Sequence, residues 1–278
     1  MFQPRSAILC AVVAIYCSAS DVNAQGLIFS IPEDGSGIEY AGTVSYETIR
    51  ADIAEGKETI TKARELSIKS VGVEDADFEG VTQPCRWIEI KVTTGTKGEA
   101  GIDPGPVGSR IYKFLVPESK LIGKATDADS IPNIVLPIVK GYRRSGEAAV
   151  RPMKSRAIAI YPTICQLTHY PEPEVVAETE SPQTRLGESS GRSFNAKHLK
   201  GRKVMERPSS RSTNEGNFWV SDEAPFGLVR WEVTVTQEKK ESTATRDTFQ
   251  EVSTTTCEMS VSKIEANAES ELVIPNNQ

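Results

Sequence analysis

The sequence predicts a β-rich α+β fold, in which a large curved antiparallel sheet forms an incomplete half-barrel and one or two short helices lie against it. Three observations predict this class. Apolar and polar residues alternate in several segments, as half-buried strands require. Glycine, proline and other turn residues gather between those segments. Segments whose apolar residues follow the helical period are few.

The alternating segments are rich in threonine, valine and aromatic residues, which favour strands. The clearest one spans residues 87–93, where Ile88, Ile90 and Val92 would face the core and charged neighbours would face water. In residues 40–48, Tyr40, Val44 and Tyr46 would share one face. The other expected strands are 66–71, 111–116, 231–236 and 257–261.

Helical periodicity is confined to one clear segment. Residues 131–144 place apolar side chains at helical spacing, with Pro132 suited to a first turn and Pro137 expected to kink or end the helix. Residues 47–58 fit a helical turn, or equally a strand followed by a hairpin at Glu55-Gly56.

Residues 171–216 differ in composition from the rest of the chain. They contain few apolar residues, and they are acidic in the first part and basic in the second. We expect a long charged loop here, with residues 171–192 mobile, because little apolar surface is available to offset the ordering entropy. Residues 198–205 could form an exposed strand that leads back to the sheet.

The first 24 residues have the pattern of a secretory signal peptide. Arg5 is followed by an apolar stretch at residues 7–18, and small residues at positions 22 and 24 predict cleavage before Gln25. A spanning helix needs about 20 apolar residues, which is longer than this stretch. We therefore expect a periplasmic or secreted protein that does not span a membrane after cleavage. Residues 25–278 would form a single domain.

Three cysteines remain after cleavage, namely Cys85, Cys165 and Cys257. An oxidising compartment allows one disulfide among them, but all three could equally be buried and free. With only two histidines and no CxxC motif, no structural metal site is expected. No cofactor-binding motif is present either, because the glycines of residues 95–108 do not follow a phosphate-binding order.

No catalytic residues are predicted. His169 and His198 are the only histidines, and no serine lies in a GxSxG motif. Asp222 and Glu223 fit a turn before Pro225. The net charge of −6 argues against nucleic acid as a partner. The basic residues 197–211 are typical of a solvated face, although they could contact an anionic partner.

Aromatic residues cluster in residues 217–232, around a turn at Asp222–Pro225. Such a cluster forms a core or lines a ligand cavity. If a cavity exists, we expect the inward faces of the strands to line it. The expected lining residues are Tyr46, Ile88, Ile90, Phe114, Trp219, Phe226, Trp231 and Val233.

The same segment carries the pattern W-x-S-x-x-x-P-x-G-x-V, with Trp219, Ser221, Pro225, Gly227 and Val229 in the specified positions. It resembles the run that joins two late strands in periplasmic carriers of the outer-membrane lipoprotein-sorting type (LolA-like) and in related exported bacterial proteins. Residues 111–117 resemble the strand-to-turn step of such proteins. The resemblance implies a curved, incompletely closed sheet with an apolar cavity that accepts acyl chains.

Two functions follow as hypotheses. The first is a non-enzymatic exported binding protein that holds a lipid or another apolar small molecule in the concave face of the sheet. The second is a structural or protein-interaction domain of the cell envelope with a packed interior, whose residues 171–216 contact an envelope protein. An enzyme of unrecognised type is a third and weaker hypothesis.

Overall fold

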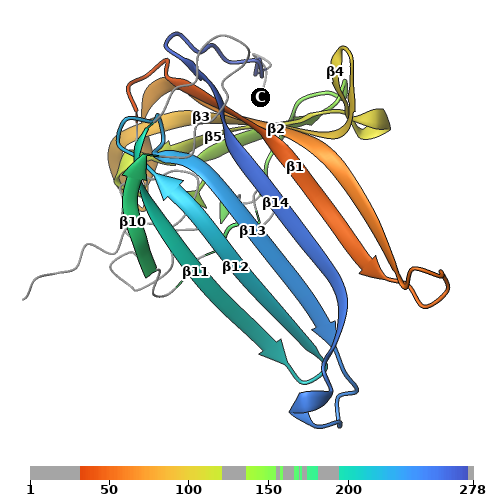
Figure 1. The fold of residues 1–278 in the computed structure, drawn as a ribbon. Helices are drawn as coiled ribbons and strands as arrows, with labels where there is room; N and C mark the ends of the chain where they lie inside the picture. The colour runs from red at the N-terminus through yellow and green to blue at the C-terminus, as the bar shows by residue number, and fades with distance from the viewer. Residues whose placement is uncertain are drawn as a thin grey trace, which may run out of the picture.

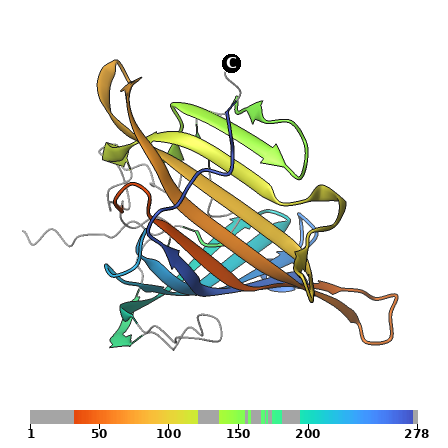
Figure 2. The same cartoon turned by 90° about the horizontal axis from the view of Figure 1, so that it is seen from above.

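One large antiparallel sheet organises the chain in a computed structural model that describes residues 32–120, 136–154, 157–158, 166–168, 170, 174–180 and 194–274. Within these residues the sheet has 12 strands and is not closed. Its strand order is β10-β11-β12-β13-β14-β1-β2-β3-β5-β7-β8, and β4 pairs with β3 outside this path. Strands β6 and β9 form a separate two-stranded sheet. The large sheet curls strongly (Figures 1 and 2).

The longest strands lie near the middle of this order, where the first described strand of the chain, β1, pairs with the last, β14. The strands of the large sheet are β1 (Gly37–Ile49), β2 (Lys57–Phe78), β3 (Val81–Gly98), β4 (Gly101–Asp103), β5 (Arg110–Pro117), β7 (Lys140–Ser145), β8 (Arg151–Pro152), β10 (Glu174–Glu180), β11 (Asn195–Arg207), β12 (Ser210–Val220), β13 (Leu228–Lys239) and β14 (Gln250–Glu265). The small sheet consists of β6 (Leu136–Pro137) and β9 (Ala157–Ile158).

All six alternating segments are strands, as predicted. In β3, Ile88 and Ile90 are fully buried and Val92 nearly so, and all three belong to the main core cluster. Successive side chains of a strand point to opposite faces. We call the face that carries this cluster the core face and the opposite one the outer face.

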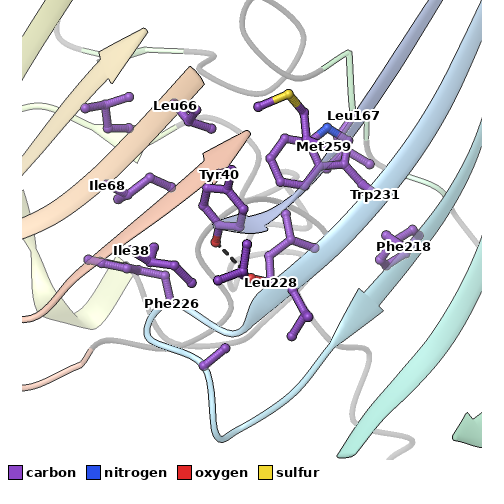
Figure 3. Packing of buried hydrophobic residues seen from close by; sticks show 14 of the residues in the cluster. Ile38, Tyr40, Leu66, Ile68, Leu167, Phe218, Phe226, Leu228, Trp231 and Met259 are labelled. Atoms are coloured by element: carbon purple, nitrogen blue, oxygen red, sulfur yellow. Dashed lines mark hydrogen bonds between the residues drawn. The ribbon is translucent and has the colours of Figure 1, made fainter. Parts of the chain in front are cut away.

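The core cluster joins residues from both halves of the sheet (Figure 3). The hydroxyl of Tyr40 on β1 donates a hydrogen bond of 2.8 Å to the carbonyl oxygen of Leu228 on β13. The Tyr40 ring meets the Trp231 ring edge-on, with 4.9 Å between centroids. The predicted turn between β12 and β13 is present, and Phe226 adopts a left-handed φ of 64° there with its side chain fully buried.

The helix expected over residues 131–144 is wrong for the described part, residues 136–144. Strands β6 and β7 occupy it, and Gly141 pairs with Phe114 on β5. Leu136 and Ile138 are buried in the core cluster, so tertiary pairing outweighs the local helical spacing. Residues 131–135 lie outside the described residues.

Residues 47–58 follow the hairpin alternative. Strand β1 ends at Ile49, β2 begins at Lys57, and Gly56 provides the positive φ of 69° that the turn requires. The described residues contain 3-10 turns at Gly105–Val107, Glu118–Lys120 and Arg246–Thr248, and no α-helix. The helical part of the α+β class therefore stays a prediction.

The expected loop over residues 171–216 is wrong for the residues that the structure describes within it. Strands β10, β11 and most of β12 lie there. The strand predicted for residues 198–205 is confirmed, because these residues lie within β11. The polar side chains of β11 and β12 alternate with Leu199 and Phe218, which are buried in the core cluster. Two large apolar residues paired across β11 and β12 thus anchor this part of the sheet in the core.

Two paired glycines on this part of the sheet accommodate a tyrosine ring. Gly201 on β11 pairs with Gly216 on β12. A Cβ atom would lie 2.3 Å from the Tyr170 ring at Gly201 and 2.2 Å from its hydroxyl at Gly216. The Tyr170 hydroxyl donates a 2.6 Å hydrogen bond to the Oδ1 atom of Asn214. The absence of side chains at the two glycines therefore lets Tyr170 pack directly on the sheet.

We expect Gly216→Ala to lower the free energy of unfolding by about 1–3 kcal/mol, the usual cost of overpacking. The added methyl group would force the Tyr170 ring away from the sheet and weaken its bond to Asn214. Urea denaturation followed by circular dichroism measures the change. Gly98→Ala is the control, because its Cβ would meet only an ordinary 3.6 Å contact. Equal losses in the two variants would contradict this explanation.

Candidate functional site

The structure buries seven of the eight residues expected to line a cavity. Trp219 is 7% exposed, and the other six are at most 1% exposed. All seven belong to the core cluster. Tyr46 differs, because it is 37% exposed and lies outside that cluster. The buried residues are Ile88, Ile90, Phe114, Trp219, Phe226, Trp231 and Val233.

Strand register places the Trp219 side chain on the face opposite to Phe218 and Trp231, although its ring still contacts the core cluster; the inward direction expected for it is therefore not observed. Trp219 pairs with Arg230 on β13, whereas the preceding Phe218 pairs with the core residue Trp231. The Trp219 ring stacks on His198, with 4.3 Å between centroids, and the Arg230 guanidinium lies 5.3 Å from the ring centroid. This stack explains the low exposure of Trp219 without a ligand. His169 lies outside the described residues.

Beyond the packed core, two rows of side chains on the core face are largely accessible, and Tyr46 lies in the first of them; Asn214 is the exception, because it is 8% exposed beneath Tyr170. Because side chains two residues apart share a face, the register defines each row. The row next to the core consists of Ile60, Tyr46, Thr255, Val235, Asn214 and Lys203, paired in that order across β2, β1, β14, β13, β12 and β11. The second row consists of Glu58, Thr48, Ser253, Gln237, Ser212 and Met205 on the same strands. We call these twelve residues the open rows.

The boundary between the packed core and the open rows is sharp. Two residues before Tyr46 on β1, Val44 is fully buried, and its partner Cys257 is fully buried too. In the open rows, by contrast, Ile60 is 48% and Met205 is 56% exposed. Figure 1 shows the six strands continuing together to their hairpin turns. The same sheet face is therefore closed by protein at one end and solvent-accessible at the other.

A depression of about 820 Å³ lies at the hairpin turns beyond the open rows, and its lining includes the carboxylates of Glu241 and Glu251. Its lining includes the laterally paired residues Ser210, Lys239 and Gln250 together with apolar Ile49 and Val252. The open rows carry Lys203, and Lys62 lies beside them on the core face. In the described chain, Glu58 is the only carboxylate of the open rows, and it lies 3.0 Å from the Arg50 guanidinium. Half of the open-row residues are uncharged and polar, and the apolar ones are Tyr46, Ile60, Val235 and Met205.

The described cysteines are unsuited to nucleophilic chemistry. Cys85 and Cys257 are free and buried, and Cys165 lies outside the described residues. Burial raises the pKa of the Cys257 thiol despite the nearby Arg64 guanidinium, so the thiol stays protonated at neutral pH. No disulfide joins the two described cysteines, which agrees with the alternative of buried, free thiols for Cys85 and Cys257.

Within the described residues, no three His, Cys, Asp or Glu side chains are grouped so that they could hold a metal ion. No described helix has the length and apolar character needed to cross a membrane. Comparison with protein-family models finds no match, and comparison with curated proteins finds none. The motif from Trp219 to Val229 forms the end of β12, the turn and the start of β13, and the resemblance that it suggests stays a prediction.

Most of the open rows could not be predicted from the sequence, because their apolar residues are isolated along the chain. Ile60 lies between two threonines, and Met205 lies in a charged segment. Each strand contributes only one or two of these residues, and the register brings them together. One feature of the sequence did indicate the open rows. Tyr40, Val44 and Tyr46 are an even number of residues apart, so they share one sheet face, and Tyr46 continues that face past the packed core.

Proposed function

We propose that this protein is an exported, non-enzymatic binding protein that holds an apolar or amphiphilic ligand, such as a lipid, against the open rows. In this proposal the sheet acts as an incomplete half-barrel. The packed half provides a rigid body, and the open half provides the binding surface. Export rests on the signal-peptide pattern of residues 1–24, which lie outside the described residues.

One observation carries the proposal: Ile60 and Tyr46 are directly paired, exposed, and adjacent to a closed core. Soluble proteins normally cover neighbouring large apolar side chains, and accessible apolar surface in register marks a binding face. Full burial of such a side chain is worth about 1.5–3 kcal/mol. Since these residues are already partly buried, useful affinity requires contacts on several strands.

The dimensions and charges of the surface favour an elongated ligand. Six neighbouring strands spaced about 4.8 Å apart give roughly 24 Å across the open rows. An acyl chain can contact Met205, Val235 and Ile60 in succession across this width. Lys203 and Lys62 flank the apolar residues, and they would attract an anionic end group.

The packed interior supports a second candidate, a structural or protein-interaction domain of the cell envelope. The seven buried residues leave no room for a ligand at their own positions. On this alternative, an envelope protein would cover the open rows instead of a small molecule. The two candidates differ in whether a purified monomer binds a free apolar ligand.

Ile60→Asp should weaken binding of a fluorescent fatty-acid probe at least tenfold, because it places a charge among the apolar contacts. Thr61→Asp is the matched control, since the neighbouring side chain points to the outer face, where it bonds with Ser45 at 2.8 Å. Probe titration with both variants and the wild type measures the difference. Co-purifying lipid in an organic extract, identified by mass spectrometry, would support the proposal independently.

Two results would count against ligand binding. One is a wild-type protein that fails to bind the probe and yields an empty extract. The other is equal weakening by Ile60→Asp and Thr61→Asp, which would place the probe elsewhere. Capture of an envelope protein by the wild type, lost in Ile60→Asp, would then favour the second candidate.

A further inference from the structure

The C-terminal segment, residues 266–274, lies on the outer face of the sheet and is bound there by the buried carboxylate of Glu89. Glu89 on β3 is 1% exposed. Its Oε1 atom accepts a 2.8 Å hydrogen bond from the backbone N–H of Glu271, and its Oε2 atom accepts one of 3.0 Å from the N–H of Leu272. The Ser270 hydroxyl donates a further bond of 2.6 Å to Oε2. One side chain thus contacts three consecutive residues of the segment.

Lysines from three strands complete this contact. Glu271 lies between Lys69 on β2 and Lys91 on β3, with N–O distances of 2.9 and 2.6 Å. Although burial raises the pKa of Glu271, its hydrogen bonds to Lys91 and Lys69 outweigh that effect and lower the pKa overall. Lys113 on β5 donates a 2.8 Å bond to the Ser270 hydroxyl. The segment is therefore recognised by charge as well as through its backbone.

An apolar contact follows the polar ones directly. The Leu272 side chain is fully buried. Upstream, the Ala268 N–H donates a 2.6 Å bond to the Gly35 carbonyl. Figure 2 shows the segment leaving β14 and crossing over β2 and β3. The segment has no regular secondary structure, so it is held as an irregular peptide on a rigid sheet.

We propose that Lys69, Glu89, Lys91 and Lys113 form a peptide-binding site for the pattern Ser-Glu-Leu, and that this site accepts the C-terminal segment of a second copy in exchange for its own. The pattern follows from the contacts. A hydroxyl bridges Glu89 and Lys113, an acidic side chain bridges two lysines, and the next residue is apolar and buried. None of these contacts depends on the covalent link between segment and sheet.

A second copy is the occupant that fits best, because its segment reproduces every bond. The contacts join residues about 180 positions apart in sequence, for example Glu271 and Glu89. A segment from a second copy carries the same residues and would make the same bonds as in the single chain, which is the basis of domain swapping. Within one chain, the tether raises the effective concentration of the resident segment into the millimolar range. Exchange should therefore become measurable once the resident segment is weakened.

The test uses the full chain with Glu271→Ala and Leu272→Ala together, and a labelled peptide of residues 266–274 as the probe. Fluorescence anisotropy should show saturable binding of the wild-type peptide. A peptide with Leu272→Asp should bind at least tenfold more weakly, and adding Glu89→Gln to the protein should cause a similar loss. Absence of saturable binding by a variant that retains its circular dichroism spectrum would overturn the proposal.

The wild-type chain provides a second measurement that does not depend on the folding of the variant. Excess unlabelled peptide should displace the resident segment and accelerate hydrogen exchange at the Glu271 and Leu272 amides. The Leu272→Asp peptide should leave both exchange rates unchanged. If the wild-type peptide also leaves them unchanged at millimolar concentration, the site does not exchange its occupant and the proposal fails.

Discussion

Trp231→Ala should lower the free energy of unfolding by about 3–5 kcal/mol, the typical loss for a large aromatic residue in a packed core. Trp231 is fully buried and lies between Phe218 and Met259 on the neighbouring strands. It also makes the edge-on contact with Tyr40. Its removal opens a cavity where the two halves of the sheet meet. Urea denaturation with circular dichroism detection measures the loss.

Trp87→Ala is the control for this substitution. Trp87 is partly exposed on the outer face, where its Nε1 atom donates a 3.1 Å bond to Glu74. We expect a loss of about 1 kcal/mol there, the usual value of one hydrogen bond with limited packing. If Trp231→Ala lowered the free energy of unfolding by no more than Trp87→Ala does, the core face would not be packed as described.

Glu89→Ala should lower the free energy of unfolding by about 3 kcal/mol. The substitution removes the acceptor of two backbone N–H groups and leaves Lys69 and Lys113 without the carboxylate between them. Breaking a buried, hydrogen-bonded charge arrangement typically costs about 3–5 kcal/mol. We expect the lower end because released residues 270–272 can regain hydrogen bonds to water. Chemical denaturation measures the total loss of unfolding free energy, and hydrogen exchange at residues 271 and 272 shows whether that loss arises in the C-terminal segment.

Glu89→Gln separates the geometry of this contact from its charge. The amide oxygen can still accept one backbone hydrogen bond, so the loss should be clearly smaller than with alanine. Protection of the Leu272 amide should fall in both variants, whereas amides of the core strand β13 should lose no more protection than the measured change in global stability accounts for. Unaltered protection of residues 271 and 272 in Glu89→Ala would show that another group holds the segment.

The sequence was sufficient to predict the strands whose apolar residues alternate without interruption. Residues 87–93 and 231–236 lie in β3 and β13 because each buries one face in the core. The turn before Pro225 was also predictable, because its residues favour tight turns. These features depend on local periodicity and turn chemistry, which one sequence displays.

Features that depend on strand register were not predictable. Gly201 and Gly216 make sense in strands only because Tyr170 covers both. Residues 136–144 show helical spacing, but they form strands because β5 provides a partner. Trp219 and Trp231 lie on opposite faces because Phe218, and not Trp219, pairs with Trp231. A one-residue change in register reverses every side chain, and composition does not determine that choice.

Photo-crosslinking with a diazirine-labelled fatty acid, followed by peptide mass spectrometry, tests the central claim most directly. We expect adducts on the open rows, in peptides that contain Tyr46, Ile60 and Met205, and competition by unlabelled fatty acid. Adducts confined to outer-face residues such as Thr61, or no competable adduct at all, would contradict the claim that this open part of the core face binds the ligand.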